Sequence, residues 1–392
     1  MKSQIKLNIF LYYLALGIVI SIYTNVFPKV YEVLGFSKYQ ISILIAIPFI
    51  GALFQIIIGY ISDYTKKYVG VIKLLLYTLV LTSIALFFVN SFISFLIILL
   101  ILSIARFPLF VLSDNIMLHF TNKNKLNFGT LKKGSSIGFG ASLVLVLPFY
   151  LILGVKSIFI ILILLTVMAI YLIGKIPKDE TFDDTEEEPV KLKDLKLLVN
   201  NHKALLLLSF QFIFMGVSSL KFSYQILKFS TVTDNTLYPA IALVCATVPE
   251  IMFLHLYPKI KKKINLPTNK ILFIIPLINI VQMILFLTIN NPLLLIGVAT
   301  IHGFGMMFYI PGYISYLREA TDEKIRATTM VLGTTLQALF ALILGFVLAP
   351  IYDKYHIQGV YIVFIVMLCI SLIPLVLLNI QENKKKGETI WK

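Results

Sequence analysis

The chain has 392 residues, and its 34 Lys and Arg against 19 Asp and Glu give a formal net charge of +15. It is 59% hydrophobic and only 14% charged, with a mean hydropathy of +0.92. Water-soluble domains are about 45–50% apolar and about 25% charged. The composition therefore excludes a soluble enzyme, a nucleic-acid-binding protein and a disordered chain, and it predicts a protein that crosses a membrane several times.

Apolar runs of the length that spans a bilayer recur along the whole sequence. Each run is expected to be helical, because backbone N–H and C=O groups have no water partners in hydrocarbon. The predicted fold is an all-α polytopic membrane protein with twelve transmembrane helices in two six-helix pseudo-symmetric bundles. The expected spans are 8–28, 40–61, 70–89, 93–117, 134–153, 156–175, 203–224, 236–257, 270–289, 292–316, 328–350 and 358–379.

Lysine and arginine predict the orientation of these spans. Most of these basic residues lie in the segments on the same side of the membrane as the N-terminus. The positive-inside rule assigns that side to the cytoplasm. We therefore expect a cell-membrane protein with both termini cytoplasmic. The opposite loops are expected to hold only Lys29, Lys38, Lys156, Lys221, Lys228 and Lys354.

A long polar stretch at the middle of the chain divides the spans into two sets. We predict an N-terminal bundle at 1–175, a cytoplasmic linker at 176–202, a C-terminal bundle at 203–380 and a cytoplasmic tail at 381–392. In transporters built from two such sets, the halves rock about a site near the middle of the membrane.

Ionisable residues within spans are costly to insert and mark function by default. Such residues here are Arg106, Asp114, Lys132, Glu250 and His302. Asp114 lies near the end of the fourth span and Lys132 at the start of the fifth. The carboxylate and the ammonium could therefore meet and offer an acceptor and a donor to a polar solute. Arg106, two helical turns from Asp114, could line the same cavity.

Each of these residues also has a structural interpretation. Asp114 could cap a helix end, and Lys132 could be a lysine that anchors a loop. Arg106 could pair with another helix. Glu250 could be a neutral, hydrogen-bonded core carboxyl, and His302 a satisfied core histidine.

No motif for covalent catalysis, nucleotide binding or metal ligation is found in the sequence. We expect no enzymatic activity, no cofactor and no metal. Cys245 and Cys369 lie in separate apolar runs, so no disulfide is expected.

The segment 54–67, FQIIIGYISDYTKK, resembles the signature between spans two and three of the major facilitator superfamily. Gly59, Asp63, Lys66 and Lys67 match it, whereas Tyr64 stands where a basic residue is usual. The resemblance implies a charged latch on the inner side that favours the outward-facing state. Arg326, in a segment similar to the family's entry to span eleven, is assigned to the same latch.

The resemblance extends to the lactose permease branch, whose members carry oligosaccharides, nucleosides or phenylpropionate with protons. The run 128–139, FGTLKKGSSIGF, is similar to that branch's fifth span, with Lys132 in the place of its sugar-binding Arg. Asp114 stands eighteen residues earlier, in the place of the partner Glu. Phe139 falls where the permease stacks a Trp on the sugar, although core packing would explain it equally.

The branch also implies roles in the second half of the chain. His302 matches the permease's tenth-span histidine in spacing, and we include it with Arg106 among the substrate-binding candidates. Gly305 replaces the permease's proton-coupling Glu. The resemblance therefore moves proton coupling elsewhere, to Glu250, which has a counterpart in the phenylpropionate and nucleoside relatives, and to Asp114.

Taken together, these patterns predict a secondary transporter, working by proton-coupled symport of a small polar solute such as a saccharide or nucleoside. The expected partners are that small molecule, protons and the lipid bilayer, without nucleic acid, and the expected state is a monomer. An exporter of drugs or amphipathic metabolites is the first alternative, and a non-transporting receptor or scaffold is the second.

Overall fold

The structure, a computed structural model, describes residues 2–176, 198–264 and 268–390. All the elements in this part of the chain are helical. The first half contains α1 (Lys2–Ser21), the π-helical turn η1 (Ile22–Val26), α2 (Phe27–Val33), α3 (Lys38–Ala46), the 3-10 turn η2 (Ile47–Ile50), α4 (Gly51–Thr65), α5 (Tyr68–Phe88), α6 (Phe92–Lys123), α7 (Phe128–Leu153) and α8 (Lys156–Ile173). The second half contains α10 (His202–Val232), α11 (Leu237–Ile264), α12 (Thr268–Thr288), α13 (Pro292–Ala320) and α14 (Glu323–Ile390).

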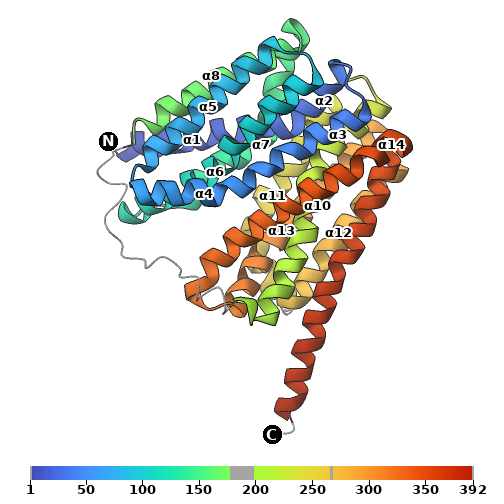
Figure 1. The fold of residues 1–392 in the computed structure, drawn as a ribbon. Coiled ribbons are helices and arrows are strands. Elements are labelled where there is room, and N and C mark those ends of the chain that lie inside the picture. The colour runs from blue at the N-terminus through green and yellow to red at the C-terminus, as the bar shows by residue number, and fades with distance from the viewer. Residues whose placement is uncertain (1, 177–197, 265–267, 391–392) are drawn as a thin grey trace.

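These helices coincide with the predicted spans, although the apolar part of α11 found within the described residues, Leu237–Glu250, is shorter than the predicted span 236–257. Within the described residues, 10 helical segments are long and apolar enough to cross a membrane. The longest, in α14, has 55 residues and contains the last two predicted spans. A straight helix of that length would measure about 80 Å, far more than the roughly 30 Å of a bilayer core. The backbone leaves the helical region at His356 (φ 57°, ψ −159°), where α14 turns back on itself (Figure 1).

The predicted linker falls almost entirely on residues outside the described ones, as do the last two residues of the predicted tail. The boundaries of the four segments therefore stay predictions.

The two halves repeat one packing scheme. In the first half α1 packs on α7 and α4 on α6, and in the second half α10 packs on α14 and α11 on α13. In each half the first span packs on the fifth and the second span packs on the fourth, since α14 supplies both the fifth and the sixth span of the second half. Figure 1 shows the halves as separate groups of helices, blue to green and yellow-green to red.

Glycine allows the closest of these helix contacts. A Cβ atom at Gly17 would collide with the carbonyl of Ser135, and one at Gly138 would collide with the carbonyl of Leu14. The backbones of α1 and α7 thus touch along several turns, as small residues permit in membrane bundles. This contact fixes α7, and with it Lys132, against the first helix.

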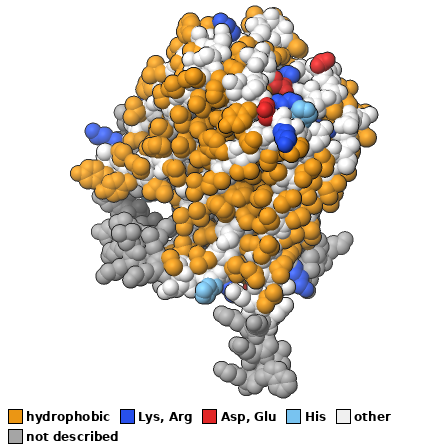
Figure 2. Space-filling model, turned by 45° about the vertical axis from the view of Figure 1, so that its right-hand side comes forward, with side chains coloured by type: hydrophobic (Ala, Val, Ile, Leu, Met, Phe, Trp, Pro, Cys, Tyr) orange, Lys and Arg blue, Asp and Glu red, His pale blue; other side chains and the backbone are white. Residues whose placement is uncertain are grey.

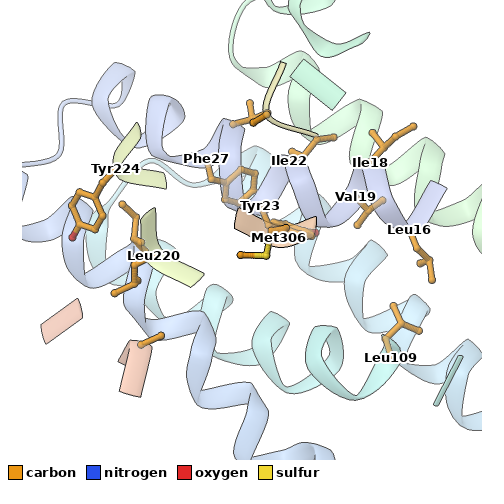
Figure 3. Close-up of a cluster of buried hydrophobic side chains, with 14 of the residues drawn as sticks. Leu16, Ile18, Val19, Ile22, Tyr23, Phe27, Leu109, Leu220, Tyr224 and Met306 are labelled. Atoms are coloured by element: carbon orange, nitrogen blue, oxygen red, sulfur yellow. The ribbon is translucent and has the colours of Figure 1, made fainter. Parts of the chain in front are cut away.

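The halves meet mainly at the end of the molecule opposite the N-terminus. Hydrogen bonds that join them there link Thr24 to Ser223 (2.8 Å), Lys29 to Ser230 (3.1 Å), Lys38 to His356 (2.7 Å), and Ser42 to Gly345 (3.1 Å) and to Tyr224. A further hydrogen bond between the halves, from Gln55 of α4 to Thr335 of α14 (2.5 Å), lies away from that end. Apolar side chains fill the same joint. Tyr23 and Phe27 of the first half belong to the same cluster of buried side chains as Tyr224 of α10 and Met306 of α13 (Figure 3). Toward the N-terminus the two groups of helices diverge (Figure 1).

A continuous apolar surface surrounds the helices. Large hydrophobic side chains are exposed on many of them, including Ile152 at 80% and Leu81 at 66%. Figure 2 shows this apolar band on one face, with charged side chains gathered beyond it. The surface is that of a protein whose sides contact lipid.

Two of the lysines predicted for the opposite loops are instead buried. Lys221 and Lys228 lie in α10, each 1% exposed. Lys221 lies within the expected span 203–224 itself, and Lys228 lies beyond it because α10 continues to Val232, about two turns past the end of that span. Hydrogen bonds stabilise both ammonium groups, and Lys228 donates to Asn290 Oδ1 at 2.8 Å.

The α1–α7 contact leads to a stability prediction. We expect Gly138→Ala to lower the free energy of unfolding by about 1–3 kcal/mol, because the new methyl group would displace the carbonyl of Leu14. Thermal unfolding of the purified protein measures the effect. Gly297→Ala is the control, since a Cβ atom there meets no atom within 4 Å. Equal melting temperatures for the two variants would contradict the proposed close packing.

Candidate functional site

Asp114 and Lys132 form an ion pair between α6 and α7. The short connection between these helices ends in Asn127, whose side chain caps α7 by accepting the amide of Thr130 at 3.0 Å. The hydroxyl of Tyr13 on α1 donates to Asp114 Oδ1 at 2.9 Å. The predicted convergence of the carboxylate and the ammonium is therefore present in the structure, with a phenol added.

The pair is partly open to its surroundings. The side chains of Asp114 and Lys132 are 30% and 40% exposed. Lys132 Nζ also lies 5.6 Å from the centre of the Phe128 ring. The site thus presents an acceptor and a donor beside an aromatic ring, with both charged side chains partly exposed.

Arg106 contacts aromatic rings. Its guanidinium carbon lies 6.0 Å from the ring centre of Tyr23 and 5.3 Å from that of Phe107. Eight residues along α6 place it about 12 Å from Asp114. These contacts fit the structural interpretation, and a role for Arg106 in binding solute stays a prediction.

Glu250 and His302 lie together in the second half. Glu250 Oε2 is 3.9 Å from His302 Nε2, and the histidine is 4% exposed whereas the glutamate side chain is 22% exposed. Gly303 makes this approach possible, because a Cβ atom there would lie 2.8 Å from the backbone nitrogen of Glu250. A carboxylate beside an imidazole is an arrangement that can bind and release a proton.

Phe139 connects the two halves. Its ring meets Phe222 of α10 edge to face at 5.7 Å, and Phe222 in turn meets His302 at 4.6 Å. Nothing in the sequence pointed to Phe222, because a phenylalanine in an apolar run is ordinary. In this conformation Phe139 packs against another side chain, and stacking on a ligand stays a prediction.

Lys221 was missed as a site residue. Its ammonium donates to Asn279 Oδ1 at 2.6 Å and to Gln282 Oε1 at 3.1 Å, both on α12. Gln282 also donates to the carbonyl of Val298 at 3.0 Å, one turn before His302 on α13. The available signal was its position within the expected span 203–224, where an ionisable residue is costly and marks a candidate site.

The residues assigned to the latch lie at the ends of two helices. Gly59 and Asp63 are in α4, which ends where Lys66 adopts the left-handed conformation (φ 54°). Lys66 and Lys67 are exposed, and Arg326 lies in the first turn of α14. The side chain of Asp63 is outside the described part of the structure, so the latch stays a prediction.

Comparison with known proteins identifies the fold. The family model described as Major Facilitator Superfamily matches residues 9–339. No curated protein matched the sequence. Among solved structures, a point mutant of the nucleoside transporter NupG has a TM-score of 0.81 at 15% identity, covering 95% of this chain and 99% of that one.

Two further solved structures are similar over nearly their whole length. An auto-inhibited POT family peptide transporter has a TM-score of 0.76 at 11% identity, covering 97% of both chains. A D-xylose–proton symporter has a TM-score of 0.69 at 14% identity, covering 94% of this chain and 96% of that one. At such identities the likeness concerns the fold alone. Because the family model spans most of the sequence, the chain belongs to the Major Facilitator Superfamily and is a membrane-spanning secondary transporter, not an enzyme.

Proposed function

We propose that this chain carries a small polar solute, such as a saccharide or nucleoside, together with protons across the cell membrane. The observation that carries the proposal is the partly exposed ion pair of Asp114 and Lys132 with Tyr13. A pair that served only the packing of the bundle would be expected to be buried, because water competes with exposed polar contacts.

Substrate would bind between the halves, with Asp114 accepting and Lys132 donating hydrogen bonds. Phe139 and Phe222 would close the site on the side of the inter-half joint. Arg106 and His302 stay candidates for further contacts. Two of the similar structures are named as a nucleoside transporter and a sugar–proton symporter, which supports this class of solute.

Coupling to protons would use Glu250 beside His302, with Asp114 as a second candidate. Moving an unpaired charge through a closed bundle is costly, so protonation of a carboxylate would permit the loaded carrier to reorient. No ATP-binding motif is found in the sequence, and an ion gradient would therefore drive uphill transport.

We propose a cytoplasmic location for both termini, with the protein acting as a monomer in the cell membrane. With that orientation the halves meet on the outer side and diverge on the inner side, which corresponds to an inward-facing state (Figure 1). The latch of Gly59, Asp63, Lys66, Lys67 and Arg326 would close the inner side in the opposite state.

The ion pair can be tested by exchanging its charges. We expect Asp114→Lys combined with Lys132→Asp to melt near the wild-type temperature, because a partly exposed pair contributes only about 0.2–1 kcal/mol to stability. Solute uptake should fall at least about tenfold, since Tyr13 would no longer meet a carboxylate and a charged hydrogen bond to the solute would be lost. Wild-type uptake by the exchanged variant would reduce the pair to a structural role.

Proton coupling can be tested at Glu250. In proteoliposomes we expect the right solute to drive proton uptake, reported by a pH-sensitive dye. Glu250→Gln should abolish that proton movement while leaving solute exchange, because exchange requires no net proton transfer. The control is Asp353→Asn, an exposed carboxylate at the turn of α14.

Unchanged proton uptake in Glu250→Gln would exclude coupling through this residue. A counterflow screen over sugars, nucleosides and aromatic acids identifies the solute. If no solute is taken up and deletion of the gene sensitises cells to lipophilic cations, the chain is an exporter of amphipathic molecules.

A further inference from the structure

Arg106 is a cation near the midpoint of α6, a helix long and apolar enough to cross the membrane. Placing a charge at such a depth is costly, and charged residues there almost always pair with one another or with backbone carbonyls. Whether the fold itself compensates the charge of Arg106 therefore indicates what this residue is for.

The guanidinium of Arg106 has no anionic partner. In the part of the chain that the structure describes, it makes no ion pair and donates no hydrogen bond. Asp114 is paired with Lys132, and Glu250 lies beside His302. The two carboxylates of the candidate site are thus engaged elsewhere.

Aromatic rings compensate only part of this charge. The guanidinium carbon of Arg106 lies 5.3 Å from the ring centre of Phe107 and 6.0 Å from that of Tyr23. The hydroxyl of Tyr23 is 3.1 Å from that of Ser83, so Tyr23 offers Arg106 its ring. A ring attracts a cation but does not replace an oxygen acceptor, and a guanidinium carries five N–H donors in a fixed fork. The donors of Arg106 are therefore unused.

These donors lie away from lipid and border open space. The apolar surface stripe of α6 includes Ile93, Ile97 and Ile101, which are 67%, 52% and 48% exposed. Arg106 follows Ile97 by nine residues, about two and a half helical turns, which places it on the opposite side of α6. Its nitrogens have no partner, yet they are not among the fully buried unpartnered atoms of the described residues. They consequently border space that water can enter.

A carboxylate fits the free donors of Arg106 better than a hydroxyl does. Arginine binds carboxylates through two parallel hydrogen bonds between planar groups, and such charge-assisted bonds are about twice as strong as neutral ones. A carboxylate would also neutralise the charge that the fold leaves uncompensated. A neutral solute would occupy the donors and leave the charge in place.

We propose that the transported solute carries a carboxylate and that Arg106 binds this group on the side of α6 that faces away from lipid. The inference rests on the proposed function, because it names the chemical class of the solute, an acidic saccharide or a similar small organic acid. Symport with a proton suits such a solute, since an anion and a proton together carry no net charge across the membrane. Moving the anion alone would incur the cost of an unpaired charge in hydrocarbon.

Matched pairs of acids and amides test the proposal. Glucuronate and glucuronamide, and likewise nicotinate and nicotinamide, differ in charge but little in shape. Calorimetric titration of the purified full chain, corrected for the empty micelle, measures the affinity for each. In at least one pair we expect the acid to bind at least about tenfold more tightly than its amide, since only the acid forms the charged fork with Arg106. In Arg106→Gln this preference should disappear.

Two further variants separate binding from folding. Arg318→Gln removes the same charge from an exposed position in the last turn of α13 and should keep the preference for the acid. Arg106→Lys keeps the charge but loses the fork, so it should weaken binding of the acid severalfold and leave binding of the amide unchanged. This comparison decides the question even if Arg106→Gln fails to fold.

Melting temperatures provide a readout that a structural cation would not give. Because Arg106 makes no ion pair in the fold, Arg106→Gln should melt near the wild-type temperature without ligand. The preferred acid should raise the melting temperature of the wild-type protein and leave that of Arg106→Gln unchanged.

Four results would overturn the proposal. Equal affinity for acid and amide in both pairs, or binding of neither acid, would leave Arg106 as a structural cation held by its rings. A preference for the acid that persists in Arg106→Gln would place the anion elsewhere. Stabilisation by sodium chloride but by neither acid would assign Arg106 to an inorganic ion.

The inference and the proposed function can fail separately. Proton-coupled uptake of a neutral solute, with no preference for acids, would retain the proposed function and remove the inference about charge. Tight binding of an acid through Arg106, without any proton uptake driven by solute, would retain the anion site and remove proton coupling.

Discussion

Charged groups inside a bilayer must have partners, and this requirement organises the polar interior of the chain. Lys221 lies at full burial with two amide oxygens, and Arg106 lies among aromatic rings. Asp114 and Lys132 satisfy each other, with Tyr13 supporting the carboxylate. All of these groups are held by helices that pack closely, so the apolar packing and the polar contacts depend on each other.

Exposure distinguishes Lys221 from the ion pair of Asp114 and Lys132. Lys221 is 1% exposed and has its acceptors on α12, as expected of a group whose task is within the bundle. The side chains of Asp114 and Lys132 are about a third exposed and gain little stability from their contact. For the proposed function, a pair that stabilises the fold so little is available to exchange its contact for hydrogen bonds with a solute.

The sequence was sufficient for the fold because each span is a continuous apolar run of the required length. It also sufficed for the ion pair, since a short connection between α6 and α7 must bring the ends of the two helices together. Lys221 was missed although it lies within the expected span 203–224, because it was counted with the loop lysines and its charge was not read as a buried one. Phe222 was beyond prediction, since core and lipid-facing positions are equally apolar and contacts between the halves leave no periodic pattern.

Close packing through glycines holds helices together both within each half and across the joint. Inside the first half, Gly17 and Gly138 bring α1 and α7 into backbone contact, and across the joint Gly345 brings α14 against Ala46 and Gly140 brings α7 against Thr247. Neutral hydrogen bonds add to the joint, such as that of Ser42 with Gly345, each worth about 0.5–1.5 kcal/mol. For the proposed alternating access, the joint can therefore open only if solute and proton binding offset both the lost packing and these hydrogen bonds.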